Sequence, residues 1–434
     1  MSQTGDSLLV SLSSGVSTST KDFLPFYLTF NRNGKVQQDQ SVFLEGRGMF
    51  KKYLGKQWYL KGEFELRNTL LSESYFQIGF NKISIWGGMR QQALGGIENN
   101  QLSTGSLALG NNARPIPQLN GELTEYVGVP FSRGYLKFKG GISHGWLGDD
   151  RYVKKALLHQ KYVKVLVDLD ELIGLKIYSS MIHIAQYGGM SPDLGALPKD
   201  IDDYWRVFFG QGIPGVDGGE GNGLGNHLGI TEWTLDKKID EYRLAINYQK
   251  PFEDGGSMQY LSFKDFLLGI QLSFPQESKI KRIYIEWVRT MSQSGPGLPD
   301  STEEYYTRED NFGYEIGGRD DYYNNWIYQS GWTNHNQTLS NPLFLTYNWS
   351  LNFLPVFPNY QNQVINNRLS AFHLGLMAEP NEKIQLKLML TYSKNFGTYA
   401  GLYQGRFAWN GIQTDPNFDY VFLGGKKQLY SMVE

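Results

Sequence analysis

The sequence predicts an all-β chain, and it favours an antiparallel β-barrel that crosses a membrane over a soluble β-sandwich or propeller. Apolar and polar residues alternate with a period of two along most of the 434 residues. Aromatic residues make up 15% of the chain and Gly occupies 50 positions, a composition typical of strands and tight turns. The apolar faces often carry aromatic side chains at strand ends, and the opposite faces are charged, as a membrane barrel with a wet lumen requires.

The overall composition excludes several classes of protein. The net charge is −2, which gives no electrostatic reason to bind nucleic acid. The chain has no Cys, so it has no disulfides and no thiolate metal sites. The most apolar long window, 165–185, is interrupted by charged residues such as Asp168 and Lys176, so it cannot cross a membrane as a helix. No signal peptide is visible at the start, so we expect a mature or trimmed form.

Roughly sixteen segments along the chain read as strands. Many of them pair as hairpins across short turns, such as 368–379 with 382–395 across Glu379-Pro380-Asn381. In chain order the predicted strands are 41–50, 56–67, 75–90 (two strands), 123–129, 134–142, 161–168, 174–184, 227–236, 240–250, 268–274, 281–292, 343–354, 368–379, 382–395 and 427–433.

The alternation also predicts which face of each strand meets lipid. In 56–67 the apolar face carries Leu60 and Phe64, while Glu63 and Glu65 fall on the other face. A charge on the lipid face costs on the order of a few kcal/mol, so the apolar faces should point outward. The predicted lipid-facing positions are Leu60, Phe64, Leu244, Ile246, Leu386 and Leu388.

Three long stretches break the alternation and are predicted to be loop or plug insertions. Residues 91–120 are rich in Gly, Asn, Ser and Pro, and residues 293–341 are polar and aromatic without a clean period. Residues 186–226 contain a predicted short helix over 201–209, which opens with three acidic residues, Asp200, Asp202 and Asp203.

No motif in the chain predicts an enzyme. Gly141-Ile142-Ser143-His144-Gly145 fits the hydrolase pattern G-x-S-x-G, but no helix signal follows it. The six His residues show no metal-ligand spacing, although His183 and His227 could meet in space as a hydrogen-bonded pair. The carboxylates clustered over 300–321 are more typical of a solvated surface than of a glycosidase. We therefore predict no catalytic residue, no metal and no cofactor.

One segment, 320–335, has the residue types of a carbohydrate site. Aromatic rings stack on the apolar faces of sugars, and amide and imidazole groups hydrogen-bond their hydroxyls. The alternative is that these rings pack inside the barrel and hold the loop in place. The candidate carbohydrate-binding residues are Tyr322, Tyr323, Asn324, Asn325, Trp326, Trp332 and His335.

Several loop motifs occur in order along the chain and cover roughly residues 80 to 335. They are Leu102-Ser103-Thr104-Gly105-Ser106-Leu107, Asn112-Ala113-Arg114-Pro115-Ile116-Pro117, Pro130-Phe131 to Gly141, His144-Gly145-Trp146, Leu158-His159-Gln160-Lys161-Tyr162, His183-Ile184-Ala185-Gln186-Tyr187-Gly188-Gly189, Gly225-Asn226-His227-Leu228-Gly229 and Tyr323-Asn324-Asn325 to Gly331-Trp332. Together these motifs are specific, and they resemble the signature of Wzi-type capsule assembly proteins.

The resemblance implies a transmembrane outer-membrane β-barrel of Gram-negative bacteria, with about 16–18 strands and loop or short-helix plug elements. It also implies a non-enzymatic, lectin-like protein that assembles or retains capsular polysaccharide. The implied partners are outer-membrane lipid or lipopolysaccharide, the surface polysaccharide and other outer-membrane proteins, with no nucleic acid. The alternative function is a porin-like channel or an accessory barrel subunit of a larger outer-membrane machine.

We expect residues 1–434 to form a single barrel domain. The chain ends in alternation, at Tyr430-Ser431-Met432-Val433-Glu434, without a terminal aromatic residue. Because an unpaired strand edge in lipid leaves backbone groups unsatisfied, we expect the last one or two closing strands to be absent from this sequence.

Overall fold

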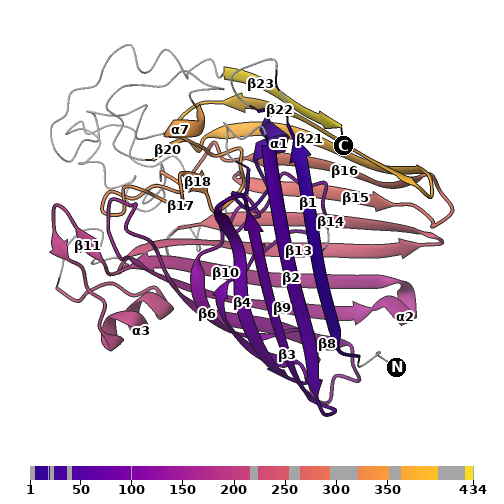
Figure 1. Ribbon diagram of the computed structural model, residues 1–434, viewed down its shortest axis with the longest axis horizontal. Helices are drawn as coiled ribbons and strands as arrows, with labels where there is room; N and C mark the ends of the chain where they lie inside the picture. The colour runs from indigo at the N-terminus through magenta and orange to yellow at the C-terminus, as the bar shows by residue number, and fades with distance from the viewer. Residues whose placement is uncertain are drawn as a thin grey trace, which may run out of the picture.

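The computed structural model describes residues 5–17, 19, 24–36, 42–98, 100–215, 223–253, 264–293, 321–350, 363–398 and 426–433. Its main feature is one antiparallel sheet of 17 strands, in which each strand pairs with its neighbours along the chain. The sheet curves into the wall of a barrel (Figure 1). This confirms the predicted fold class. In the described part of the chain, no helix is long and apolar enough to cross a membrane.

The wall strands follow chain order. They are β1 (Ser7–Val16), β2 (Val42–Leu54), β3 (Trp58–Arg67), β4 (Leu70–Phe80), β5 (Ile83–Met89), β6 (Pro117–Leu123), β7 (Val127–Gly128), β8 (Leu136–Trp146), β9 (Leu157–Leu169), β10 (Leu175–Tyr187), β13 (Asn226–Ile239), β14 (Tyr242–Phe252), β15 (Phe266–Ser273), β16 (Ile280–Arg289), β21 (Leu369–Asn381), β22 (Ile384–Asn395) and β23 (Lys426–Val433).

Shorter elements lie in the connections between these strands. The short pairs are β11 (Met190–Ser191) with β12 (Gly195–Ala196), β17 (Thr333–Asn334) with β18 (Gln337–Thr338), and β19 (Leu345–Thr346) with β20 (Val364–Asn366). The helices are α1 (Phe26–Thr29), α2 (Asp170–Ile173), α3 (Ile201–Phe209) and α7 (Tyr347–Ser350).

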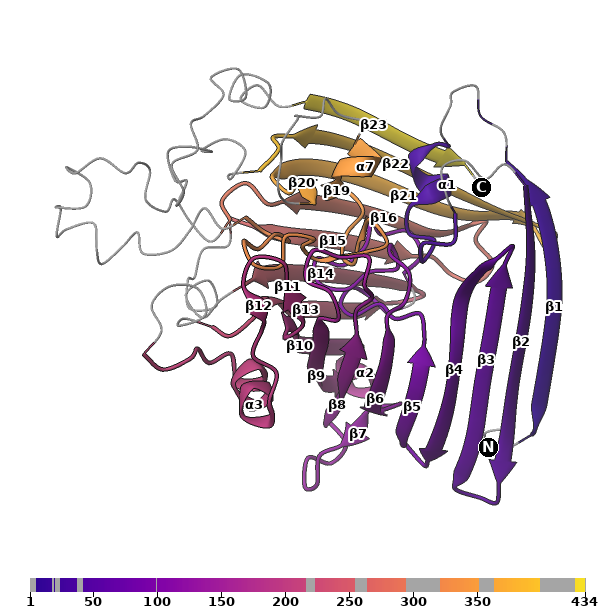
Figure 2. The same ribbon diagram turned by 60° about the vertical axis from the view of Figure 1, so that its left-hand side comes forward.

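The two ends of the wall differ in their connections. At one end, here called the turn end, strands such as β13 and β14 are joined by tight turns. At the other, the loop end, the long connections 90–116, 188–225 and 290–368 leave and re-enter the wall (Figure 2). In outer-membrane barrels the short turns face the periplasm and the long loops face the exterior. The two edges of the wall are β1 and β23, which do not pair with each other in the described residues.

The two faces of the wall are as predicted. Phe64 is 50% exposed on the outer face, whereas its neighbours Glu63 and Glu65 are buried on the lumen side. Leu386 is likewise exposed, while Leu60 and Ile246 are partly exposed. The apolar side chains therefore point towards lipid and the charged ones towards the lumen.

A band of aromatic rings crosses the outer face near the loop end. Trp233 lies 6.2 Å from Tyr248, Tyr248 lies 5.7 Å from Phe266, and Phe266 lies 4.8 Å from Trp287. Phe372 continues the row 5.3 Å from Trp287. Each ring belongs to a different strand, from β13 to β21, so the row forms the kind of girdle that marks a membrane interface.

Three strand predictions were wrong. The predicted strand 123–129 is not continuous, because β6 covers Pro117–Leu123, partly in the predicted loop 91–120, and only Val127–Gly128 forms the short strand β7. Residues 343–350, the described part of the predicted strand 343–354, do not form a wall strand: Leu343, Phe344 and Leu345 are all buried, so these successive side chains do not alternate between two faces. This segment contributes only the short strand β19 and the helix α7. The strand β1 was not predicted, although Leu8, Val10 and Leu12 alternate on one exposed face of it.

Candidate functional site

The connection between β5 and β6, residues 90–116, lies inside the lumen and is called the plug here. Polar side chains from the lumen face of four different strands hold its backbone and hydroxyl groups. Glu232 on β13 accepts from the Gly96 N–H, and Gln249 on β14 accepts from the Leu107 N–H at 3.0 Å. Glu286 on β16 accepts from the Ser103 hydroxyl at 2.6 Å, and His373 Nε2 on β21 donates to the Leu102 carbonyl at 2.6 Å.

Two further segments lock the plug in place. From the segment before β2, Asn31 Nδ2 donates to the Thr104 carbonyl at 2.7 Å. From the insertion between β16 and β21, Asn341 Nδ2 donates to the Gly105 carbonyl at 2.9 Å. In the other direction, Asn112 of the plug donates from its Nδ2 to the Thr338 carbonyl of the insertion at 2.9 Å. Several of these residues belong to the motifs that carry the family resemblance, so those motifs form the contacts inside the lumen.

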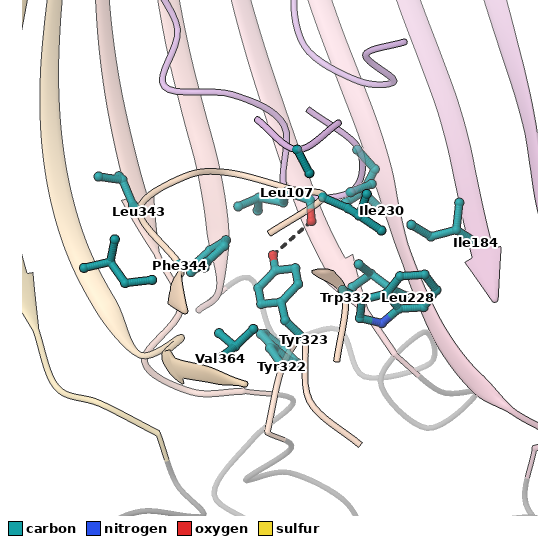
Figure 3. Close-up of a cluster of buried hydrophobic side chains, with 14 of the residues drawn as sticks. Leu107, Ile184, Leu228, Ile230, Tyr322, Tyr323, Trp332, Leu343, Phe344 and Val364 are labelled. Atoms are coloured by element: carbon teal, nitrogen blue, oxygen red, sulfur yellow. Dashed lines mark hydrogen bonds between the residues drawn. The ribbon is translucent and has the colours of Figure 1, made fainter. Parts of the chain in front are cut away.

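The aromatic candidates mostly fill the loop-end half of the lumen. Tyr322, Tyr323 and Trp332 are buried in a cluster with Ile184, Leu228 and Ile230 of the wall and Leu343, Phe344 and Val364 of the insertion (Figure 3). The Tyr323 hydroxyl donates to the Leu107 carbonyl of the plug at 2.9 Å (Figure 3). These three rings therefore stabilise the fold of the insertion. Trp326 differs, because its side chain is 62% exposed.

The polar candidates divide in the same way. Asn324 is buried, and its side chain pairs with the backbone of Val364, donating at 2.8 Å and accepting at 3.1 Å. Asn325 is partly buried and accepts from the Ile327 N–H at 2.9 Å. His335 is exposed, and its Nδ1 lies 2.9 Å from an Asp150 carboxylate oxygen. Of the seven candidates, Trp326 and His335 are therefore the exposed ones.

His335 lines an open pocket of about 300 Å³ at the loop end, called the loop-end pocket here. The connection between β8 and β9 and the insertion after β16 form this pocket together. Its lining residues are Asp149, Asp150, Arg151, Tyr152, Ser330, Thr333, His335, Asn336 and Gln363. Sequence reasoning missed the residues from 149–152, for which the only local signal was a Gly-Asp-Asp turn beside an aromatic residue.

Arg151 fixes one wall of the loop-end pocket. Its guanidinium donates to the Gly331 carbonyl at 2.9 Å and also to the Thr333 carbonyl. Burial lowers the pKa of Arg151 to about 10, so it stays cationic at neutral pH. Although the His335 side chain is 45% exposed, partial desolvation of its imidazole and the nearby Arg114 charge lower its pKa, against the opposite effect of Asp150. At neutral pH the pocket thus offers a neutral imidazole beside carboxylates.

Trp326 belongs to the same turn as the loop-end pocket. The Gln329 side chain donates to the Trp326 carbonyl at 3.4 Å, and Ser330 Oγ accepts from the Tyr152 N–H at 2.8 Å. The exposed Trp326 ring therefore lies four residues in the chain before Ser330, which lines the pocket together with the Tyr152 phenol and several hydroxyl-binding groups. Such a set can stack on a sugar face and bind its hydroxyls.

A second cavity, of about 750 Å³, lies on the turn-end side of the plug. Its charged lining includes Arg90 and Glu122, which form an ion pair at 2.7 Å, together with Lys139 and Lys164 of the wall. Plug residues such as Gly95 and Gly96 line this cavity, and none of its lining residues also lines the loop-end pocket.

The motifs weighed for enzymatic chemistry have other positions. Ser143 is buried in the middle of β8 and faces the lumen, so the G-x-S-x-G run forms no exposed turn. His183 Nε2 lies 2.9 Å from His227 Nδ1, as a hydrogen-bonded pair. No group of His or carboxylate residues with metal-site geometry occurs among the described residues. The carboxylates of 300–320 lie outside the described residues.

Comparison with solved structures finds outer-membrane β-barrels. Wzi, an outer-membrane protein involved in group 1 capsule assembly in Escherichia coli and described as a carbohydrate-binding β-barrel, is similar at a TM-score of 0.50 and 15% identity; the match covers 89% of this chain and 70% of that one. OmpF of Salmonella typhi matches at a TM-score of 0.40 and 9% identity, covering 99% and 96%. The channel DcaP of Acinetobacter baumannii also matches at 0.40 and 9%, covering 100% and 96%.

No protein-family model matches the sequence, and no curated protein matches it. At 15% identity, the likeness to Wzi concerns the fold alone. That fold, the apolar outer face and the aromatic band agree with the predicted location in the bacterial outer membrane.

Proposed function

We propose that this chain belongs to the Wzi-type group and is a non-enzymatic, lectin-like barrel that assembles or retains capsular or other surface polysaccharide. The observation that carries the proposal is the plug. Four wall strands bind it through buried polar side chains such as Glu286 and His373, so the lumen is built to be filled. An open pore needs a wide, unobstructed lumen instead.

The sugar site in this proposal is the loop-end pocket with Trp326 at its side. Long loops of outer-membrane barrels face the exterior, where a capsule lies. Trp326 supplies the stacking ring, while His335, Asn336 and Gln363 supply hydroxyl partners. Tyr322, Tyr323 and Trp332 act indirectly, because they hold the insertion that presents these groups.

A paired substitution tests the sugar site. Trp326→Ala removes the exposed ring, and we expect cells that make capsule to release it into the medium while the barrel still folds. Trp58→Ala is the matched control, because Trp58 is a similarly exposed ring on the outer face of β3, far from the pocket in the chain and at the turn end. Normal capsule retention in a folded Trp326→Ala variant would count against this site.

The alternative function, a porin-like channel or an accessory barrel, has one observation in its favour. The turn-end cavity is large and lined by charged groups such as Lys139 and Lys164, as ion-conducting lumens are. Conductance in a planar lipid bilayer separates the two functions. The lectin-like proposal predicts no steady open channel, whereas a stable conductance of the unaltered protein would support the channel.

A further inference from the structure

Four His residues lie close together on the outer face of the wall, on four adjacent strands: His144 on β8, His159 on β9, His183 on β10 and His227 on β13. His144 on β8 is the register partner of His159 on β9, and Ala185 on β10 pairs with both His159 and His227 of β13. The intervening positions, such as Gln186 and Glu232, face the lumen, where they contact the insertions. The four His residues therefore occupy the face that elsewhere carries apolar side chains towards lipid. Unpaired polar groups are costly there.

The helix α3 covers these His residues from outside the barrel. The Tyr204 ring lies 5.4 Å from the ring of His159, and the Phe208 ring lies 5.2 Å from it on another side. Val207 packs with Ala185 of β10, which also points outward. His159 is completely buried as a result. The helix forms over the predicted residues 201–209, but it lies outside the wall and does not fill the lumen (Figures 1 and 2).

Local sequence fixes both ends of α3. Asp200 and Asp203 form a capping box at the N-terminus, and Gly210 ends the helix in the left-handed conformation at φ 64°. Between these ends, three large apolar residues are exposed on one side of the helix: Ile201 at 68%, Trp205 at 49% and Phe209 at 64%. They are four residues apart and so form one continuous stripe.

The contacts of α3 show which way this stripe faces. At about 100° per residue, the side chains follow one another round the helix in the order Val207, Tyr204, Phe208, Ile201, Trp205 and Phe209. Val207 packs with Tyr187 and Leu224 near the loop end. Phe208 contacts Lys161, whose Nζ lies 3.9 Å from the ring centroid. Lys161 lies closer to the turn end of the wall than the contacts of Val207 do. The stripe continues in that direction, towards the membrane.

The wall surface next to the stripe is itself apolar. Beyond Lys161, the outer face of β9 continues with Val163 and Val165, both exposed, and β8 contributes the exposed Ile142 opposite Lys161 and Phe138 opposite Val165. The stripe of α3 thus continues the apolar outer face of the wall. On strands β13 to β21, the aromatic band forms the border of that same face. Asp202 and Arg206 lie beyond the stripe, on the side of the helix that is turned away from the wall.

We propose that α3 is an interfacial helix that inserts Ile201, Trp205 and Phe209 into the outer leaflet of the membrane, with the lipid acyl chains as its partner. An apolar face with Trp and Phe and a charged opposite flank is the composition of helices that lie in the interface. Continuity with the lipid-facing wall identifies lipid as the occupant of the stripe. The inference rests on the outer-membrane fold and does not depend on polysaccharide binding.

Site-directed spin labelling tests this inference directly, because the chain has no Cys and each introduced thiol is unique. The full chain carrying Trp205→Cys is labelled and inserted into vesicles of phosphatidylethanolamine and phosphatidylglycerol. The test compares collision rates with oxygen, which concentrates in lipid, and with a water-soluble nickel chelate. Phe64→Cys provides the lipid-facing reference, and Arg206→Cys, about 100° away on the same helix, is the matched control.

The expected result is that the label at 205 resembles the label at 64, with oxygen collisions dominating, and that the label at 206 shows the reverse. Labels at 201 and 209 should follow the label at 205. A label at 205 that collides mainly with the nickel chelate would overturn the proposal. Spin–spin broadening at 205, which would report a second copy on the stripe, would overturn it as well.

Discussion

The plug and the helix α3 are both parts of loop-end insertions, yet they are held to the same wall by opposite means. Buried polar side chains such as Glu286 hold the plug through hydrogen bonds. Ring and apolar contacts such as Tyr204 against His159 hold α3, together with the hydrogen bond that Lys161 donates to the Phe208 carbonyl. The difference follows the two surfaces of a membrane barrel, because polar groups in the lumen can pair, whereas the outer face favours apolar cover.

The largest effect should come from removing a polar anchor of the plug. Glu286 accepts from Ser103, Thr104 and Tyr284 and is completely buried. We expect Glu286→Ala to lower the free energy of unfolding by about 3 kcal/mol, since it leaves buried donors unpaired. Denaturant titration measures this loss, and bilayer conductance should show transient channel openings. Glu125→Ala, at an exposed ion pair, is the control and should change neither.

A smaller effect should follow on the outer side. Phe208→Ala removes the ring that covers His159 and Lys161. We expect it to lower the free energy of local unfolding of α3 by about 1–2 kcal/mol. Amide hydrogen exchange over 201–209 should then speed up while exchange in β9 and β10 stays slow. Arg206→Ala is the matched control, because that side chain lies beyond the stripe and is turned away from the wall; equal acceleration in both variants would contradict the contact between Phe208 and the wall.

Removing a hydrogen bond between the plug and the insertion after β16 should lower stability less. Tyr323→Phe keeps the ring in its buried cluster and removes only the hydroxyl that donates to the Leu107 carbonyl. The expected loss is about 1 kcal/mol in the free energy of unfolding, with no change in conductance. An unchanged denaturation midpoint would mean that water replaces the lost donor without cost.

The smallest effect concerns pH at the loop-end pocket. The pKa of His335 is lowered in the fold, chiefly by partial desolvation of its imidazole, so the unfolded chain binds its proton more readily. Stability from this residue is complete above the ordinary His pKa of about 6.5 and is lost as pH falls through the lower pKa of the folded state. His335→Asn should flatten the stability profile below pH ~6.5, and an identical profile in both proteins would exclude His335 as the cause.

Local patterns determined much of the fold. Glu65 and Phe64 took opposite faces of β3 because successive side chains of a strand must alternate. The helix over 201–209 formed between Asp200 and Gly210 because both ends are capped by neighbouring residues. The loop motifs of 102–107 and 112–117 also proved to be contact segments of the plug, although their partners on the wall and the insertion could not be predicted from the sequence.

Only the tertiary structure decided which insertion entered the lumen and which aromatic residues stayed exposed. Tyr323 and Trp326 are three residues apart in a segment without periodicity, yet one is buried and the other is exposed. The Tyr323 hydroxyl bonds to Leu107, a partner 216 residues away in the chain. Likewise α3 lies outside the wall, where Tyr204 contacts the outward-facing ring of His159. Burial of this kind depends on surfaces that exist only once the distant strands have paired, so no local pattern encodes it.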